Sequence, residues 1–194
     1  MNNFPRGRVA FLATGNLHKF NEVRRILKEY QIATVMLKKV DAVEIQDDHT
    51  ENIAKASAID AFEKCGLPVI VEDAGLFVEV LEGFPGPYSS YIYRTIGNDG
   101  VLKLMENTAN RNAVFKSVVA FTSAEMNKPL CFVGEVKGEI VKEKRGVHGF
   151  GFDPIFSPLN SSKTFAEMIV EEKNKHSHRA LAFREFAEWY TASF

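Results

Sequence analysis

The chain has 194 residues, of which 45% are hydrophobic and 25% are charged, with 24 Lys and Arg against 25 Asp and Glu. These values are typical of a folded globular protein and exclude disorder, collagen-like repeats and low complexity. The net charge of −1 argues against a broad surface for nucleic acid or for an anionic membrane, because such surfaces need a basic field. We therefore expect neither nucleic acid nor a membrane as a partner.

The length fits one domain over residues 1–194, since domains average roughly 150 residues. The first residues, MNNFPR, contain no apolar segment of the kind that secretory signals carry. Cys65 and Cys131 are isolated thiols without metal-ligand spacing, which we interpret as reduced core residues. These features predict a cytoplasmic protein.

In the first half, predicted strands and helices alternate. Residues 8–14 form a short apolar strand, and residues 17–30 form a helix with Phe20, Val23, Leu27 and Tyr30 on one stripe and Ile26 at its edge. A second strand is predicted at 33–37 and an extended stretch at 42–46. Asp48 and Glu51 resemble a capping box that opens a helix ending at Gly66, and residues 68–72 form another buried strand.

In the second half, longer strands replace the short ones. Residues 76–80 are either a strand or a helical turn, residues 83–87 form a rigid loop with two prolines, and helices are predicted at 89–96 and 99–107. Strands follow at 113–121 and 130–141, the second with period-two patterning, and a helix at 178–190 completes the set. The fold class is therefore α/β, with a mixed elongated sheet flanked by helices.

The first candidate site is the segment between the first strand and the first helix, Thr14-Gly15-Asn16-Leu17-His18-Lys19. A helix start offers unpaired N–H groups and the positive end of a dipole, which suits a phosphate. The spacing is not that of a Walker A loop. The alternative is an ordinary strand-to-helix turn in which Asn16 caps the helix.

The second candidate is the pair Glu72 and Asp73, which directly follows an apolar strand. Adjacent buried carboxylates are costly without partners, and Mg²⁺ is a hard cation that takes one or two carboxylates together with substrate phosphates. Glu44 is a possible third ligand. The alternative is that the strand has simply reached solvent.

Two further segments are candidates for recognition of a base. In Gly149-Phe150-Gly151-Phe152-Asp153-Pro154, flanking glycines leave an aromatic ring free to stack, although two phenylalanines in a strand are more often core. In the segment 172–179, the donors Lys173, His178 and Arg179 precede the last helix; the alternative is a charged surface loop.

Six motifs in this order resemble the inosine triphosphatase family, the pyrophosphatases of non-standard purine nucleoside triphosphates. They are TGNxxK, VEDAGL, GFPGPY, GFGFDPIF, TFAEM and EEKxxxSHR, and they span residues 14 to 179. Val71-Glu72-Asp73 looks like the archaeal and eukaryotic branch. The resemblance implies Mg²⁺-dependent hydrolysis of ITP, dITP and XTP to the monophosphate and pyrophosphate by a cytoplasmic homodimer, with two lobes around a central substrate cleft.

The resemblance also assigns roles to individual residues. Thr14, Gly15, Asn16 and Lys19, with Leu17 and His18 in the same block, look like phosphate contacts, as does Lys55 in a loosely matching stretch. Glu44 and Glu72 look like metal ligands, and Asp73 looks like a metal ligand and the base that activates water. Phe150 looks like the stacking ring within the block Phe150, Gly151, Phe152 and Asp153, and Ala74 stands where many members carry a hydroxyl.

Lys173, His178 and Arg179 look like base-recognition residues, and their chemistry suggests a selectivity. Inosine and xanthine present a 6-oxo acceptor, whereas adenine presents a 6-amino donor. If His178 is charged or in the suitable tautomer, the three side chains supply donors only, and adenine would face them unpaired. Two rivals remain: a nucleotide sensor that binds without hydrolysis, and a Maf-like enzyme acting on modified pyrimidine triphosphates.

Overall fold

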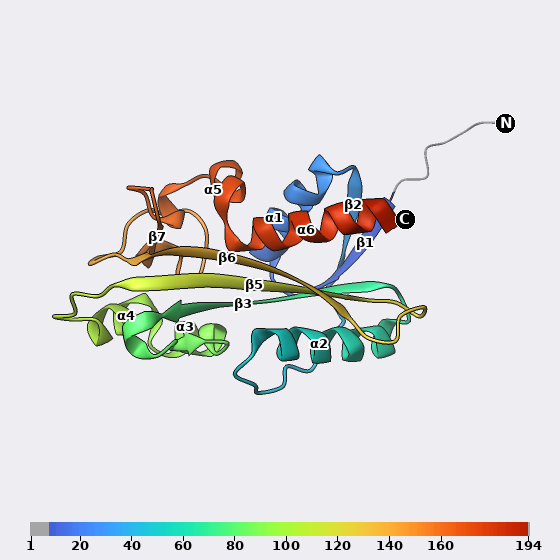
Figure 1. Cartoon of the computed structure of the whole chain (residues 1–194), viewed down its shortest axis with the longest axis horizontal. Coiled ribbons are helices and arrows are strands. Elements are labelled where there is room, and N and C mark those ends of the chain that lie inside the picture. The colour runs from blue at the N-terminus through green and yellow to red at the C-terminus, as the bar shows by residue number, and fades with distance from the viewer. Residues whose placement is uncertain (1–7, 194) are drawn as a thin grey trace.

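A computed structural model describes residues 8–193 and shows a seven-stranded mixed sheet flanked by helices (Figure 1). The strand order is β2-β1-β3-β5-β6-β7, with the short β4 paired to β3. Strand β1 is parallel to β2 and β3, and the other pairs are antiparallel. The strands are β1 (Arg8–Ala13), β2 (Ile32–Leu37), β3 (Val69–Val78), β4 (Pro85–Gly86), β5 (Asn112–Thr122), β6 (Leu130–Ile140) and β7 (Phe156–Pro158).

Within residues 8–193, six α-helices cover both faces of this sheet. They are α1 (Leu17–Glu29), α2 (Thr50–Cys65), α3 (Ser89–Thr95), α4 (Gly97–Leu104), α5 (Val170–His176) and α6 (His178–Ser193). Short 3₁₀ turns lie at Glu79–Leu81, Asp153–Ile155 and Phe165–Glu167. The last of these begins at Thr164, whose side chain forms a reciprocal capping box with Glu167 that the sequence analysis did not predict.

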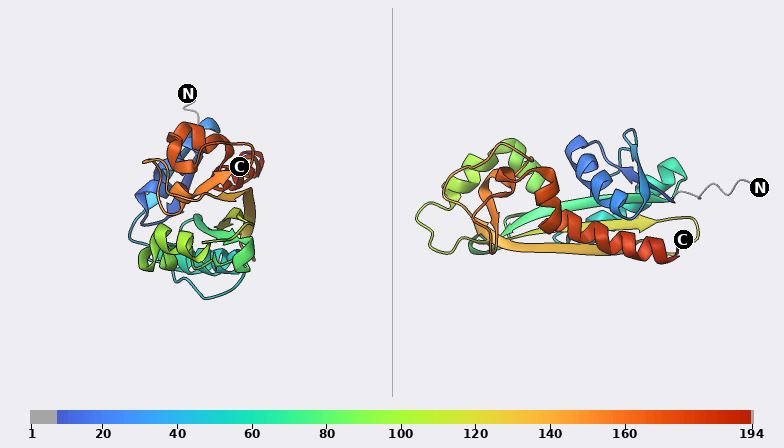
Figure 2. Two further views of the ribbon diagram at one scale, coloured as in Figure 1. Left: turned by 90° about the vertical axis from the view of Figure 1, so that its left-hand side faces the viewer. Right: turned by 90° about the horizontal axis from the view of Figure 1, so that it is seen from above.

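One end of the sheet is packed on both sides. On one face, α1 and α6 pack their apolar stripes against β1, β3, β5 and β6. On the opposite face, the small side chains Ala54, Ala58 and Ala61 bring α2 close to β3 and β5. The two views of Figure 2 show these helices on either side of the strands.

The other end of the sheet carries a separate core. The second half of β3, α4, β5, β6 and the segment from 152 to 168 bury a cluster that includes Phe115, Phe156 and Phe165. The long strands β3, β5 and β6 run through both ends (Figure 1). The chain therefore has two lobes on one sheet, as the sequence predicted.

Several predictions need correction in detail. Helix α2 begins after His49, with no side-chain cap, and Asp48 is not its N-cap; Asp47 accepts from the His49 backbone N–H instead. On α1, Ile26 is fully buried at the centre of the apolar stripe, because α6 covers that side. For residues 76–80 the sequence predicted either a strand or a helical turn, and the structure contains both: β3 continues to Val78, and a 3₁₀ turn follows at Glu79–Leu81.

The largest correction concerns the segment before α6. Residues 170–176 form helix α5 and not a charged surface loop, and Lys173 and Asn174 are buried. The helix was not predicted because its buried positions carry a cation and an amide, so no apolar stripe marks it in the sequence. The prediction about the first residues falls on 1–7, outside the described residues. Within residues 8–193, the helices are too short or too polar to cross a membrane.

Candidate active site

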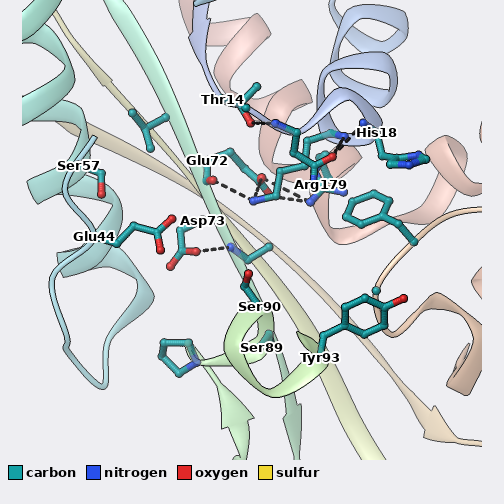
Figure 3. A pocket seen from close by; sticks show the side chains of 18 of the residues that line it. Thr14, His18, Glu44, Ser57, Glu72, Asp73, Ser89, Ser90, Tyr93 and Arg179 are labelled. Atoms are coloured by element: carbon teal, nitrogen blue, oxygen red, sulfur yellow. Dashed lines mark hydrogen bonds and ion pairs between the residues drawn. The ribbon is translucent and has the colours of Figure 1, made fainter. Parts of the chain in front are cut away.

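A cavity of about 620 Å³ lies between the two lobes and brings together segments that are far apart in the sequence (Figure 3). Its volume is in the usual range of small-molecule sites. The predicted residues that line it are Thr14, Gly15, Asn16, His18, Lys19, Glu44, Glu72, Asp73, Ala74, Phe150, Gly151, Phe152, Asp153, Lys173, His178 and Arg179. The fold therefore assembles nearly the whole predicted set in one place.

The first turn of α1 opens at this cavity. The Asn16 side chain caps the helix by accepting from the backbone N–H groups of His18 and Lys19, and Thr14 Oγ1 accepts from the Asn16 N–H. The capping interpretation of Asn16 is thus correct. It is compatible with a phosphate site, because the cap fixes the helix start and its positive dipole end beside the cavity.

Leu17 and Lys55 are not among the residues that line the cavity, and their roles as substrate contacts stay predictions. Leu17 is exposed on α1. On α2, Ser57 lines the cavity, and Lys55 is two residues earlier, about 200° around the helix.

The two adjacent carboxylates of β3 have opposite surroundings. Glu72 has not reached solvent; its side chain is 3% exposed, and it is held by Lys19 at 2.9 Å and Arg179 at 3.0 Å. Ser117 Oγ donates to Glu72 Oε1 at 2.7 Å. Burial would raise the pKa of Glu72, but the charges of Arg179 and Lys19 hold this pKa well below the ordinary value.

Asp73 lacks comparable partners. Its Oδ1 accepts from the Ala74 N–H at 3.0 Å, and its Oδ2 is buried without a hydrogen-bond partner. Burial raises the pKa of Asp73 to about 6, with Lys19 opposing the shift and Glu72 and Glu44 adding to it. A buried, unpaired carboxylate in a cleft is the kind of group that binds a cation or accepts a proton.

The three carboxylates predicted as metal ligands, Glu44, Glu72 and Asp73, differ in the partners that they already have. Among the described residues, no group of three His, Cys, Asp or Glu side chains converges to hold a metal ion. Asp73 and Glu44 fit a hard cation, because Asp73 Oδ2 has no partner and the two carboxylates face each other (Figure 3). Glu72 does not fit, because its oxygens are already held by Lys19, Arg179 and Ser117.

One wall of the cavity is a buried ionic network that contains an unpredicted residue, Glu22. Glu22 accepts from Lys173 at 2.8 Å and Arg179 at 2.5 Å, and Lys173 also contacts Asp153 at 2.7 Å. The pKa of Glu22 is lowered because Arg179 and Lys173 outweigh the effect of burial. Its signal in the sequence was an acid inside the apolar stripe of α1, beside Val23 and Ile26.

Of the two interpretations of this segment, a core residue describes Phe152, and a ring available for stacking describes Phe150. Phe152 is 3% exposed and belongs to the core, while also lining the cavity. Phe150 is half-buried, stacks on His18 with ring centroids 5.3 Å apart, and has Lys173 Nζ over its ring at 5.1 Å. Gly149 is required next to it, because its φ is +72° and a Cβ would lie 2.1 Å from Asp153 Oδ2.

The donors-only argument for base selection depends at His178 on the tautomer of the ring. Burial lowers the pKa of His178 well below its ordinary value, so the ring is neutral and stacked on Phe115 at 4.4 Å. A neutral ring has one donor and one acceptor nitrogen. His178 Nδ1 and Arg179 Nε are buried without partners, so both nitrogens are available at this wall.

Three further residues that the sequence analysis missed support the walls. Ser57 Oγ donates to the Val43 carbonyl and so fixes the segment that carries Glu44. Asn98 Nδ2 donates to the Gly151 carbonyl, and the ring of Tyr93 meets the Phe152 ring edge to face. Nothing in the local sequence of Ser57, Asn98 or Tyr93 distinguishes them, because their roles come only from tertiary contacts.

Comparison with known proteins agrees with this geometry. The family model of the Ham1 family matches residues 10–189. A protein of Methanopyrus kandleri named dITP/XTP pyrophosphatase is 51% identical over 92% of this chain and 94% of its own length. One of Hyperthermus butylicus with the same name is 49% identical over 94% of each chain.

Solved structures show the same architecture. The Ham1 protein of Staphylococcus aureus has a TM-score of 0.82 at 28% identity, covering 96% of this chain and 100% of its own. A HAM1 protein from Coxiella burnetii has a TM-score of 0.83 at 29% identity, covering 95% and 99%. The relatives are mostly archaeal, in line with the predicted branch, and the family resemblance is confirmed. With a matching family model, homologous sequences and the shared fold, this chain belongs to the Ham1 family.

Proposed function

We propose that this chain is a pyrophosphatase of non-standard purine nucleoside triphosphates, which hydrolyses dITP, ITP and XTP to the monophosphate and pyrophosphate. The relatives are named dITP/XTP pyrophosphatase. The observation that carries the proposal is Asp73 Oδ2, buried and unpaired beside a helix start and Lys19. A protein that bound the nucleotide without hydrolysing it would not need a carboxylate that can accept a proton.

The chain supplies a proton acceptor and an electrostatic clamp. Asp73 takes the proton of the water that attacks the α-phosphorus, as the bond to the β-phosphate breaks and pyrophosphate leaves. Lys19 and the N–H groups at the start of α1 stabilise the charge of the departing phosphates. With a pKa of about 6, Asp73 is mostly ionised at pH 7 and ready to accept a proton.

The proposed cofactor is Mg²⁺. Asp73 and Glu44 would hold it, because both line the cavity and their carboxylates lie next to each other (Figure 3). When bound, the ion offsets the charge of the phosphate oxygens. Ser57 keeps Glu44 in reach by fixing the neighbouring Val43 carbonyl.

Base recognition is assigned to the opposite wall. Phe150 offers a half-buried ring for stacking, with His18 on it in this structure. Arg179 Nε is an unpaired donor that suits a 6-oxo group, and an adenine 6-amino group would leave it without an acceptor. Residues from 14 to 179 contribute to the site, which supports one domain over the whole chain.

Substrate profiling tests the proposal. Pyrophosphate release is measured from dITP, ITP, XTP, GTP and ATP, with Mg²⁺ or EDTA, for the wild type and Asp73→Asn. We expect release from dITP, ITP and XTP alone, lost with EDTA and with Asp73→Asn. Binding of dITP without any release would refute the enzyme and favour the sensor, and release from modified pyrimidine triphosphates would favour the Maf-like rival.

The homodimer and the cytoplasmic location are part of the same proposal. A homodimer predicts a mass in light scattering near twice the 21.8 kDa of the chain. A mass equal to that of one chain at micromolar concentration would contradict it.

A further inference from the structure

Among the carboxylates at the cavity, Glu72 differs from Glu44 and Asp73 because cations already hold it. Its Oε2 lies 2.9 Å from Lys19 Nζ, and its Oε1 lies 3.0 Å from Arg179 Nη2 and 2.7 Å from Ser117 Oγ. A further contact of 3.4 Å joins Arg179 Nη2 to Oε2. Three donor atoms, two of them cationic, thus occupy both oxygens of Glu72, which has about four acceptor sites in all, and their positive charge opposes the approach of a metal ion.

The two cations that meet at Glu72 come from two different helices. Lys19 lies in the first turn of α1, beside the helix start assigned to phosphate. Arg179 lies at the start of α6, where it also contacts Glu22 and the Phe150 ring of the base-side wall. Two like charges this close would repel without the carboxylate between them.

The surroundings hold Glu72 rigidly in that position. Ser117 lies on the neighbouring strand β5 and faces the same side of the sheet, because Glu72 pairs with Val119 and Ala74 pairs with Ser117. Helix α6 begins directly on the sheet at Gly134, where a Cβ would lie 2.1 Å from the His178 carbonyl oxygen. This close approach lets Arg179 reach β3.

We propose that Glu72 is a positioning residue that fixes Lys19 and Arg179 relative to each other, and that it is not a metal ligand. It sets the distance between the phosphate end and the base end of the cleft. This inference rests on the proposed function, which assigns those two ends to the two parts of the nucleotide. It separates Glu72 from Asp73, its neighbour in sequence, by role.

Two binding measurements on the apoprotein test it. Mn²⁺ affinity is measured by the electron paramagnetic resonance signal of free Mn²⁺, and dITP affinity by calorimetry in EDTA, where hydrolysis does not proceed. For Glu72→Gln we expect unchanged Mn²⁺ affinity and dITP affinity weakened about 10- to 100-fold, as for loss of one partner of a buried charge pair. For Asp73→Asn and Glu44→Gln we expect Mn²⁺ affinity weakened about tenfold or more.

The opposite pattern overturns the inference: Glu72→Gln weakens Mn²⁺ binding as much as Asp73→Asn, or leaves dITP binding unchanged. Glu72→Asp restores the charge with a shorter side chain, so we expect it to recover part of the dITP affinity; no recovery would also count against the inference. If Glu72→Gln does not fold, Ser117→Ala serves instead, with dITP affinity lowered about threefold to tenfold and Mn²⁺ affinity unchanged. Both readouts are binding constants, so a lack of dITP turnover would refute the proposed function alone.

Discussion

The two faces of β3 give the neighbouring carboxylates Glu72 and Asp73 different numbers of hydrogen-bond and ion-pair partners. On the face covered by α1 and α6, Glu72 is buried with three donors and belongs to a continuous network with Lys19, Arg179 and Glu22. On the face toward α2, Asp73 has one backbone donor and a buried oxygen without a partner. Alternation along the strand produces this difference, since successive side chains point to opposite faces.

The difference indicates how the cleft is built. A fully paired network fixes side chains in place, and removing one member leaves another charge buried alone. An unpaired carboxylate is costly to the fold and free to act on a ligand. We therefore expect the paired face to position the substrate and the unpaired face to perform the chemistry.

The largest expected effect is at Asp73, where activity and stability change in opposite directions. Asp73→Asn should lower kcat by about 10²–10⁴-fold, because the proton acceptor is lost. It should also raise the free energy of unfolding at pH 7 by up to about 3 kcal/mol, since a shift of the Asp73 pKa from 3.8 to about 6 costs ~1.4 kcal/mol per unit. Steady-state kinetics measure kcat, and denaturant unfolding measures the free energy of unfolding. A variant less stable than the wild type would contradict the interpretation of Asp73 as an unpaired carboxylate that destabilises the fold.

On the paired face, removing a charge should lower the free energy of unfolding. Lys173→Met leaves Glu22 and Asp153 without their shared cation, and we expect a loss of about 3–5 kcal/mol in the free energy of unfolding. The control is Lys163→Met, which breaks an exposed pair with Glu172 and should cost less than about 1 kcal/mol. Equal losses in the two variants would show that the buried network does not hold the wall.

The pH dependence separates the faces further. Because folding raises the pKa of Asp73, the native state keeps its proton longer than the unfolded chain, and the contribution of Asp73 to stability falls as pH rises from about 4 to about 6. The stability difference between the wild type and Asp73→Asn should therefore be near zero below pH 4 and reach its full size above pH 6. Urea unfolding across this window measures it, and a difference independent of pH would exclude the Asp73 carboxyl as its source.

A smaller effect is expected at Phe150. Phe150→Ala should raise KM for dITP and XTP roughly tenfold, because stacking of a base on an aromatic ring contributes about 1–3 kcal/mol. The half-buried side chain should leave the fold intact. Tyr91→Ala, at an exposed aromatic ring away from the cavity, is the control and should leave KM unchanged; an equal effect would remove Phe150 from recognition.

The sequence by itself determined the order of elements and most of the residues of the cleft. Short apolar runs, the stripe on α1 and the alternation of β6 are local patterns, so β1, α1, β5, β6 and α6 were predicted close to their observed bounds. Strand β3 was predicted to end at residue 72, but it continues to Val78. The motifs at 14–19, 72–74, 150–153 and 173–179 also identified segments that meet at one cavity. Patterns of this kind depend on neighbours in the chain, which the sequence contains.

Only the tertiary structure decided what each polar side chain does. Local sequence makes Glu72 and Asp73 equivalent acids, and only packing places Lys19 and Arg179 against one of them. Glu22, Ser57 and Asn98 were missed, because their partners lie elsewhere along the chain. The energy of a buried charge depends on its burial and on its partners in space, and folding alone sets both.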